Sequence, residues 1–408
     1  MAEEPTIEDG AQRPPGRATS RRLLVLFAGA GAAIAALLIG AGVVIGHELW
    51  TRTTTPAAVS GNPGLTPGRF GFGGPFGGSP PSGNASGAPS DVAGIAAKVD
   101  PAIVDIDSNL SYQGASGAGT GIVVSSNGEV LTNNHVIEGA TKLTATDVGN
   151  GKTYNVSVVG YDPESDVAVL QLQGASGLET ASLGDSSKLS VGDPVVGIGN
   201  AGGGGGTPSA AGGSITALNT SLTAEDDLGG GSEQLSGMIE INAPIQSGDS
   251  GGPLVDANGK VIGIDTAGSS RSGFGYYSNT GYAYAVPIDT ALSIAKQIEA
   301  GTTSATVHVG ETAFLGVSVE SANPGFAGGS TSSGLTVQGT VSGDPAAKAG
   351  LVAGDVITAF GGQAVDTHDA LTKLLIPHHP GDKVSLTWTD ASGQSHTATV
   401  TLASGPPA

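Results

Sequence analysis

The sequence contains no cysteine and few basic residues, and both features exclude classes of function. Among its 408 residues, 16 are Lys or Arg and 36 are Asp or Glu, which gives a formal charge of −20. Without cysteine there is no cysteine nucleophile, no thiolate zinc site and no disulfide framework. The acidic balance argues against a nucleic-acid-binding protein, which needs an electropositive face. The length predicts two or three domains.

Glycine, in contrast, is abundant. Among the 408 residues, 69 are glycine and 23 are proline. Average usage, roughly 7% and 5%, would give about 29 glycines and about 20 prolines. The glycines number 17 in residues 1–90, 36 in 91–300 and 16 in 301–408. Because they are spread along the whole chain, we interpret most of them as turn residues of folded domains rather than as a sign of disorder.

An uncharged stretch of 24 residues lies near the N-terminus, at positions 23–46. As a helix rising about 1.5 Å per residue, it is long enough to cross a bilayer core of about 30 Å. It exceeds the roughly 7–15 residues of the apolar region of a secretory signal, so a retained anchor is favoured, with a cleaved signal as the alternative. Four arginines precede it: Arg13, Arg17, Arg21 and Arg22. The positive-inside rule then places residues 1–22 in the cytoplasm and the rest outside.

Residues 47–90 are expected to be a flexible linker. The block 51–90 has 10 Gly and 7 Pro, with no Asp, Glu or Lys. Such a composition cannot bury a core and is typical of a tether.

From residue 91 onward, short β-rich runs alternate with turn signals. Asn127-Gly128 and Asn258-Gly259 are strong hairpin turns, because both of their central residues can adopt positive φ. Many short strands without interleaved helices favour β-barrels over a parallel α/β sheet. We therefore predict a mostly β domain over 91–301, closed by a helix near 287–301. A smaller α+β domain follows over 305–403, with helices near 344–350 and 367–376.

The most specific motif runs from Gly248 to Pro253 and reads GDSGGP. A serine is a poor nucleophile unless a base takes its proton and hydrogen-bond donors receive the oxyanion. Glycines around Ser250 allow a tight bend that can direct the amides of Gly248 and Ser250 to one point. These two amides are the predicted oxyanion hole.

Two further motifs lie upstream of the serine. His135 ends a predicted strand in TNNHV, and Asp166 directly precedes another strand in SDVAVL. The chain order His, Asp, Ser is that of chymotrypsin-type proteases. The pattern around Ser250 also fits the nucleophile elbow of α/β-hydrolases, but that elbow leads into a helix and is followed by its acid and base. Here a strand follows, so we discount this alternative.

At this point the sequence resembles the HtrA/DegP family, in which a chymotrypsin-like protease domain precedes one PDZ domain. The similarity covers residues 91–403. It is carried by the runs GAGTGIVV at 117–124, LTNNHVI at 131–137, SDVAVL at 165–170, INAPIQSGDSGGPL at 241–254, VIGIDTA at 261–267, GYAYAVP at 281–287, AFLGV at 313–317 and AAKAGLVAGDVI at 346–357. The N-terminal anchor and tether resemble the membrane-bound bacterial members.

The resemblance implies roles for particular residues. His135 would be the general base, Asp166 the residue that orients it, and Ser250 the nucleophile. The amides of Leu315, Gly316 and Val317 would bind the terminal carboxylate of a peptide, which adds as a strand beside the 367–376 helix. Parts of the loops 221–237 and 267–281 would switch the protease between inactive and active geometries.

The resemblance further implies a homo-oligomeric, trimeric serine endopeptidase of protein quality control. It would act outside the cytoplasm on misfolded or damaged envelope proteins, with no cofactor and no metal. The alternative is a chaperone or scaffold that uses the PDZ domain with little or no proteolysis.

Two features concern specificity and the residue next to the nucleophile. Ile245, five residues before Ser250, predicts an apolar S1 pocket that accepts Val, Ala or Ile, because neither it nor Pro244 is acidic. Asp249 stands where most HtrA proteins have Asn. Burying an unpaired carboxylate is costly, so we expect Asp249 to have a polar partner or solvent contact.

Overall fold

The computed structural model describes residues 84–408 except 226–231, 269–275, 278–281 and 322–333. All described residues belong to one compact unit, Gly77–Ala408. The expected tail 1–22, the apolar stretch 23–46 and most of the linker 47–90 therefore lie outside the described residues. Within these described ranges, no helix is both long enough and apolar enough to cross a membrane.

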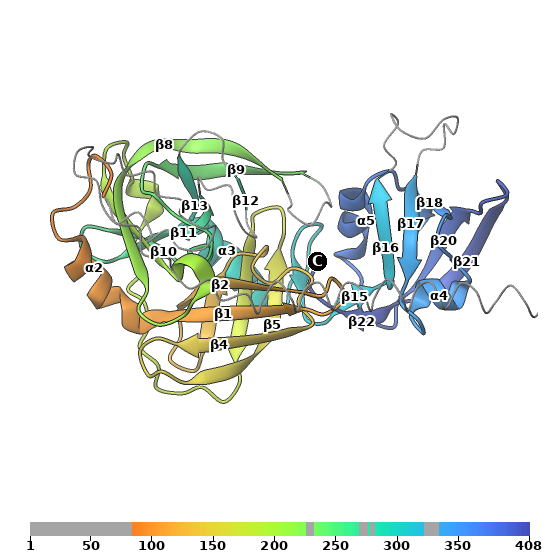
Figure 1. The fold of residues 1–408 in the computed structure, drawn as a ribbon, viewed down its shortest axis with the longest axis horizontal. Coiled ribbons are helices and arrows are strands. Elements are labelled where there is room, and N and C mark those ends of the chain that lie inside the picture. Colours follow the sequence, from red (N-terminus) through yellow and green to blue (C-terminus); the bar gives the residue numbers. More distant parts are fainter. Residues whose placement is uncertain (1–83, 226–231, 269–275, 278–281, 322–333) are drawn as a thin grey trace, which may run out of the picture. The chain divides into compact units, whose positions relative to one another are not determined.

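Six strands of the first sheet form a closed antiparallel barrel (Figure 1). They are β1 (Ile103–Leu110), β2 (Ala115–Val123), β3 (Glu129–Thr132), β4 (Lys142–Asp147), β5 (Thr153–Asp162) and β6 (Val167–Leu172). The sheet order is β14-β5-β4-β1-β2-β3-β6, and the additional pairing of β5 with β6 closes the barrel. Helix α2 (Val92–Val99) precedes it. The hairpin predicted at Asn127-Gly128 is confirmed: it joins β2 to β3, with Gly128 at φ +93°.

The second sheet also closes, through the pairing of β10 with β11. Its strands are β7 (Pro194–Gly199), β8 (Ser209–Glu225), β9 (Ser232–Ile241), β10 (Pro253–Asp256), β11 (Val261–Gly268), β12 (Tyr276–Tyr277) and β13 (Ala283–Pro287). Short 3₁₀ turns cover Asp100–Ala102, Ser186–Lys188 and Ala201–Gly203. The predicted double-barrel architecture is therefore present.

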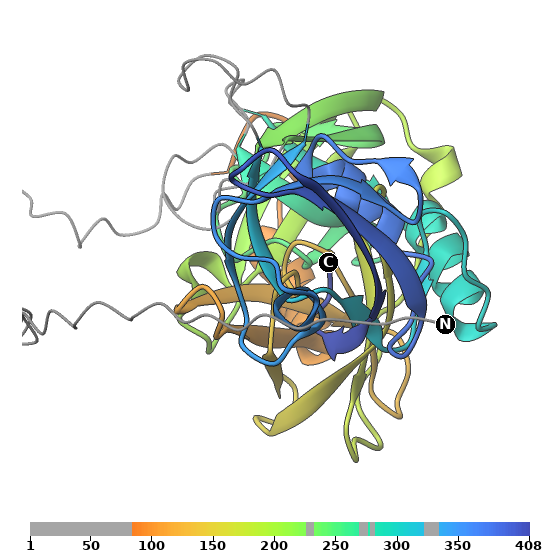
Figure 2. The ribbon, with the colours of Figure 1, turned by 90° about the vertical axis from the view of Figure 1, so that its right-hand side faces the viewer.

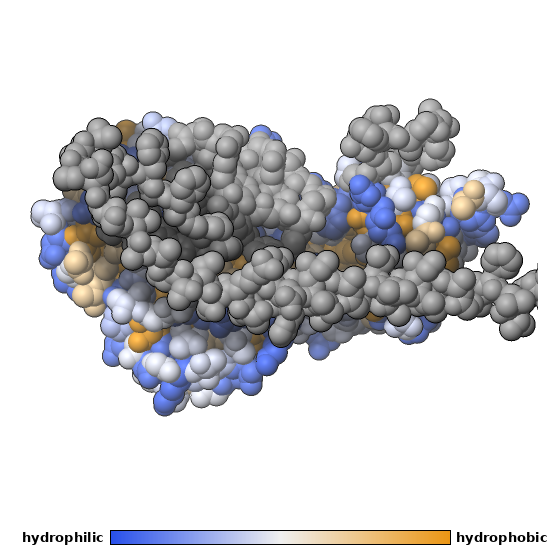
Figure 3. Space-filling view, in the orientation of Figure 1, coloured by the Kyte–Doolittle hydropathy of each residue, from blue (hydrophilic) through white to orange (hydrophobic). Residues whose placement is uncertain are grey.

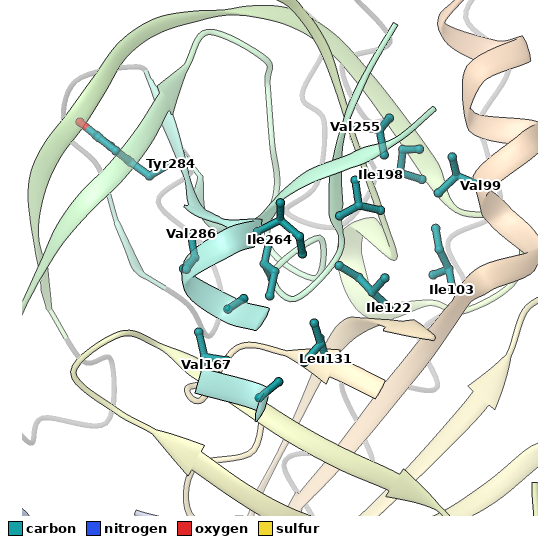
Figure 4. Close-up of a cluster of buried hydrophobic side chains, with 14 of the residues drawn as sticks. Val99, Ile103, Ile122, Leu131, Val167, Ile198, Val255, Ile264, Tyr284 and Val286 are labelled. Carbon is teal, nitrogen blue, oxygen red and sulfur yellow. The ribbon is translucent and has the colours of Figure 1, made fainter. Parts of the chain in front are cut away.

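A shared apolar cluster joins the two barrels. Figure 4 shows side chains of helix α2 and of both barrels meeting in it: Val99, Ile103, Ile122, Leu131, Val167, Ile198, Val255, Ile264, Tyr284 and Val286. Helix α3 (Ile288–Glu299) buries one face in the same cluster, including Ile294 and Ile298. Because this cluster is continuous across the barrels, it fixes their relative position. Residues from the two barrels that meet in a site between them are therefore held in place.

The C-terminal unit has its own sheet and its own apolar core, seen from the front in Figure 2. Its strands are β16 (Val317–Ser321), β17 (Leu335–Thr340), β18 (Val356–Phe360), β19 (Gln363–Ala364), β20 (Lys383–Thr389) and β21 (Ser395–Thr401); β15 (Thr312–Phe314) pairs separately with β22 (Ala403–Gly405). The predicted helices are present as α4 (Pro345–Ala349) and α5 (His368–Leu375). Strand β16 is an edge strand.

The segment between the barrels and the C-terminal sheet is fastened to the first barrel. Strand β14 (His308–Val309) pairs with β5. The ring of His308, which is fully buried, lies between those of Tyr161 and His379 at centroid distances of 5.1 Å each. The last residue, Ala408, accepts a hydrogen bond from Asn134 Nδ2 at 3.0 Å.

The visible surface of the first barrel is mostly hydrophilic to neutral in hydropathy (Figure 3).

Candidate active site

The structure brings His135 and Asp166 together. His135 Nδ1 lies 3.0 Å from Asp166 Oδ2 and 3.1 Å from Oδ1. The backbone N–H of His135 also donates to Asp166 Oδ1 at 3.0 Å. The Asp166 side chain is completely buried, whereas that of His135 is 13% exposed. A carboxylate that accepts at Nδ1 holds the proton there and leaves Nε2 to act as the base.

Asp166 reaches this position through an unusual backbone conformation. It ends the turn between β5 and β6, and its φ of +51° lies in the left-handed region. Aspartate tolerates that region better than most residues, because its short side chain can hydrogen-bond locally. Its own carbonyl accepts from the buried Asn133 Nδ2 at 2.9 Å, so a residue two positions before His135 also fixes the Asp166 turn.

Ser250 lies in the loop between β9 and β10 and is buried. The loop is attached to both barrels: the Ser250 carbonyl accepts from the Thr120 N–H at 2.8 Å, and the Gly251 N–H donates to the Asp265 carbonyl at 2.8 Å. Thr120 belongs to the first barrel and Asp265 to the second. The nucleophile loop is thereby fixed at the junction between them.

Thr266 contacts two of the three predicted catalytic residues, Ser250 and Asp166. Its carbonyl accepts a hydrogen bond from Ser250 Oγ at 3.4 Å. Its hydroxyl donates to Asp166 Oδ2, the same carboxylate that orients His135. The residue is fully buried. One residue of β11 thus contacts the nucleophile from the second barrel and the carboxylate from the first.

A hydrogen bond fixes the orientation of the peptide between Ser247 and Gly248, which is part of the predicted oxyanion hole. The Ser247 carbonyl accepts from the Gly202 N–H at 2.7 Å. In a trans peptide the following N–H points the opposite way, so the Gly248 amide faces away from Gly202. Across the described part of the chain, no backbone carbonyl accepts from the amides of Gly248 or Ser250. Both amides can therefore donate to an oxyanion.

Gly248 cannot be replaced without disturbing this peptide. Its φ is +97°, and a Cβ built on it would lie 2.2 Å from the carbonyl oxygen of Asn200. Its own carbonyl accepts from Thr120 Oγ1 at 2.8 Å. Only a glycine satisfies this conformation and this close approach together.

Asp249 has polar partners, as expected. Its carboxylate accepts from Ser209 Oγ at 3.0 Å and from the Gln246 N–H at 2.9 Å. It is only 2% exposed, and burial raises its pKa to about 6 despite these two hydrogen bonds. The fully buried Asp265 also has a pKa well above its usual range, first because of burial and second because of the charge of Asp249.

Two glycines of β7 make room for these two carboxyl groups. A Cβ on Gly197 would lie 2.8 Å from Asp265 Oδ2, and one on Gly199 would lie 2.9 Å from Asp249 Oδ1. A Cβ on Gly197 would also lie 2.1 Å from Ile245 Cδ1. Ile245 itself is buried in the apolar cluster of the second barrel. Its role in an S1 pocket stays a prediction.

In the C-terminal unit, the predicted carboxylate loop lies just before the edge strand β16. Gly316 has φ +71°, and a Cβ on it would lie 2.3 Å from Asp344 Cβ. The Leu315 carbonyl accepts from the Ala346 N–H at 2.9 Å, and the Gly316 carbonyl accepts from the Val341 N–H at 2.9 Å. Val317 begins β16 and pairs with Thr340 of β17. These bonds fix the loop from the side of α4.

The residues that sequence reasoning missed are Thr120, Thr266 and Ser209, which position the site rather than react. Thr266 follows the buried run VIGID, but nothing in that run shows which side chain its hydroxyl meets. As for metals, the described ranges contain no group of three or more His, Asp and Glu side chains arranged to hold an ion.

Comparison with known proteins adds to this geometry. A trypsin-like peptidase domain matches residues 119–264, and a PDZ domain matches residues 313–402. The chain thus has a chymotrypsin-type peptidase domain followed by a PDZ domain.

Curated relatives match most of this chain. Serine protease PepD of Mycobacterium tuberculosis is 33% identical over 325 residues, covering 77% of this chain and 66% of that protein. A probable periplasmic serine endoprotease DegP-like of Bartonella henselae is 36% identical over 293 residues, covering 71% and 53%. The solved structure of the HtrA-type protease AlgW with tripeptide is 30% identical, covers 78% of this chain and 98% of that chain, and superposes with a TM-score of 0.43.

On the two domain matches and the curated relatives, the chain belongs to the HtrA/DegP-type serine proteases. It spans about half to two thirds of the length of the curated relatives it matches.

The buried Asp249 generates a prediction about stability and pH. Because its folded-state pKa of about 6 exceeds the ordinary value of 3.8, the folded state binds the proton more tightly than the unfolded state does. The free energy of unfolding should therefore fall as pH rises from about 4 to about 6, by roughly 3 kcal/mol in total. Asp249→Asn removes this dependence because an amide does not titrate. Its oxygen can replace Oδ2 and accept from the Gln246 N–H, while its NH2 group replaces Oδ1 and can donate to Ser209 Oγ, since a hydroxyl can also accept.

Urea unfolding at pH 4 and at pH 7 measures the difference between Asp249→Asn and the wild type. The stability advantage of the variant should be larger at pH 7. Asp366→Asn, at an exposed position, is the control and should follow the wild type. The account of Asp249 is wrong if its variant differs from the wild type equally at both pH values.

Proposed function

We propose that this protein is a serine endopeptidase that hydrolyses peptide bonds through Ser250, His135 and Asp166. The observation that carries the proposal is the shared contact of Thr266 with Ser250 Oγ and with the carboxylate that binds His135 Nδ1. A buried acid, an oriented imidazole and a serine in this arrangement form the machinery for acyl transfer.

The mechanism follows from the positions of these groups. His135 Nε2 takes the proton of Ser250 Oγ as the oxygen attacks the scissile carbonyl carbon. The negative charge that develops on the carbonyl oxygen is received by the amides of Gly248 and Ser250. The imidazolium then gives its proton to the leaving amine, which departs and leaves an acyl-enzyme. Water, deprotonated by the same imidazole, attacks the ester carbon. The imidazolium returns the proton to Ser250 Oγ as the C–O bond breaks, which releases the carboxylate product and restores the enzyme.

Asp166 stabilises the imidazolium that forms in each step. Its charge is held by three donors: the backbone N–H of His135, His135 Nδ1 and the Thr266 hydroxyl. Because the carboxylate is completely buried, its attraction for the imidazolium is weakened little by solvent. Asp166 thereby holds the ring in the orientation that presents Nε2 to Ser250.

The substrates we propose are misfolded or damaged proteins of the cell envelope, cleaved after small or medium aliphatic residues. Ile245 supports the aliphatic preference, because its buried side chain belongs to an apolar cluster with Ala283 and Ala285 of β13. Curated relatives named as periplasmic serine endoproteases support the compartment.

For the C-terminal unit we propose recognition of peptide C-termini. The amides of Leu315, Gly316 and Val317 would receive the carboxylate, and the peptide would add to the edge strand β16 beside α5. The edge position of β16 supports this, because an edge strand offers unpaired backbone groups to an added strand. The same surface supports the alternative function, a PDZ-based chaperone with little proteolysis.

We also propose that residues 23–46 anchor the protein as a single-pass helix, with residues 1–22 in the cytoplasm and both folded domains outside. The uncharged length of the stretch and the arginines before it support this topology. Membrane fractionation tests it, and recovery of the full-length chain in the soluble fraction contradicts it. The protein is proposed to be a homotrimer, which a mass measurement in detergent tests.

Replacement of the nucleophile tests the proposed activity. Ser250→Ala should lower the degradation of unfolded casein by at least about 10³-fold, because the acyl-enzyme cannot form. A fluorophosphonate should label the wild type at Ser250, as mapped by mass spectrometry, and should not label the variant. Ser190→Ala, at an exposed serine, is the matched control and should keep full activity.

Equal degradation by the wild type and Ser250→Ala would refute the triad. If neither protein degrades casein but both suppress its aggregation, the chaperone alternative holds.

A second experiment tests the peptide site. Gly316→Val should weaken the binding of a peptide with a free C-terminal carboxylate by at least about tenfold, because valine is strained at this positive φ and would collide with Asp344. Binding is measured by fluorescence anisotropy, with the C-terminally amidated peptide as reference.

Gly339→Ala, where a Cβ meets nothing within 4 Å, is the control and should bind like the wild type. Equal affinity of the wild type for the free and amidated peptides would contradict the assignment of the carboxylate loop.

A further inference from the structure

An open groove of about 560 Å³ lies beside the nucleophile loop. It is lined by three strands of the first barrel and by two loops of the second. The lining residues are Asp107, Ser108, Asn109, Ser116, Gly117, Ala118, Lys142, Thr144, Gly202, Gly203, Ser247 and Gly248. Because Gly248 is also an oxyanion residue, the groove begins at the reaction centre.

The floor of the groove is a regular ladder. Strand β1 lies between β4 and β2, and both pairings are antiparallel. Directly paired residues present their side chains on the same face of a sheet, so three rows form across the strands. From the nucleophile outward these rows are Thr146, Asp105 and Thr120; then Thr144, Asp107 and Ala118; then Lys142, Asn109 and Ser116.

The first row is covered by the second barrel. Thr120 Oγ1 donates to the Gly248 carbonyl at 2.8 Å and accepts from the Asn200 N–H at 2.9 Å. Asp105 is buried and accepts from the Gly206 N–H at 3.2 Å. The nucleophile loop therefore sits over this row. The next two rows, each about 7 Å further on, are open to solvent.

Each open row carries one charge. Asp107, in the second row, and Lys142, in the third, are both exposed. Among the ion pairs formed by described residues, none includes either side chain. A carboxylate near the reaction centre and an ammonium group farther out are thus available to bind a substrate.

The direction of the substrate follows from the proposed mechanism. The leaving amine takes its proton from His135, which belongs to the first barrel. The substrate residues that follow the scissile bond therefore begin next to the first barrel. The side chain on the acyl side is expected in the second barrel, at Ile245. The groove lies on the first barrel and so faces the departing part of the substrate.

We propose that this groove binds the residues that follow the scissile bond, with Asp107 selecting a basic side chain close to the bond and Lys142 selecting an acidic one farther along. The inference rests on the proposed peptidase function. Exposed charges attract each other modestly, so each matched charge should change kcat/KM by about three- to tenfold at low salt.

The experiment uses the full-length protein in detergent and internally quenched peptides with one acyl-side sequence. A single Lys or a single Glu is moved through the five positions after the scissile bond. We expect the position where Lys gives the highest kcat/KM to precede the position where Glu does. Both preferences should shrink toward onefold as the salt concentration rises from 0.05 M to 1 M, because salt screens exposed charges.

Charge reversal distinguishes specificity from a structural role. Asp107→Lys should convert the Lys preference into a Glu preference, and Lys142→Glu should do the opposite at the outer position. The neutral variants Asp107→Asn and Lys142→Gln should abolish each preference and keep the wild-type melting temperature. Lys98→Glu, at an exposed lysine of α2, is the control and should leave both preferences unchanged.

Binding of the same peptides to Ser250→Ala gives a readout that does not depend on cleavage, and its dissociation constants should follow the same order. Equal kcat/KM and equal affinity for every charge position overturn the groove assignment, while Ser250 labelling and cleavage would still uphold the peptidase function. If Ser250 is neither labelled nor needed for cleavage, the peptidase function fails and the groove assignment fails with it.

Discussion

The structure depends on the attachment of one loop to two barrels. Ser250 comes from the second barrel, and His135 and Asp166 come from the first, so neither barrel alone contains the site. Two threonines bridge the gap: Thr120 binds the nucleophile loop from the first barrel, and Thr266 contacts both Ser250 and Asp166 from the second. The shared apolar cluster and α3 hold the two barrels in a fixed relative position around these contacts. Without that packing, the three proposed catalytic side chains would not lie together in one site.

The second constraint is the close approach of backbone segments around the site, which only glycines allow. The loop before Ser250 requires positive φ at Gly248 and a close approach to Asn200. Behind it, Gly197 and Gly199 leave the volume that Asp265 and Asp249 occupy. The site thus holds Asp166, whose carboxylate accepts from three donors, and two further carboxyl groups, Asp249 and Asp265, whose burial raises their pKa and favours the protonated form.

Much of this could be predicted from the sequence. The hairpin glycines and the short strands are local features, and they predicted the double barrel that the structure has. The motifs around His135, Asp166 and Ser250 are also local, and they are the basis of the proposed triad. The bridging roles of Thr120 and Thr266 could not be predicted, because each depends on contacts between segments more than 90 residues apart, as in the bond from Thr120 to Gly248. The groove could not be predicted either, because Asp107 and Lys142 lie on the same face of the sheet only as a result of the register between β1 and β4.

The central claim is that Thr266 assembles the catalytic residues across the two barrels. The most direct measurement is the rate at which a fluorophosphonate labels Ser250 in Thr266→Val, a variant of nearly equal shape that lacks the hydroxyl. We predict a rate at least about tenfold below that of the wild type, because Asp166 loses a buried donor and His135 loses its fixed orientation. A cooperative melting transition above the assay temperature shows that the variant is folded. Labelling at the wild-type rate would contradict the account.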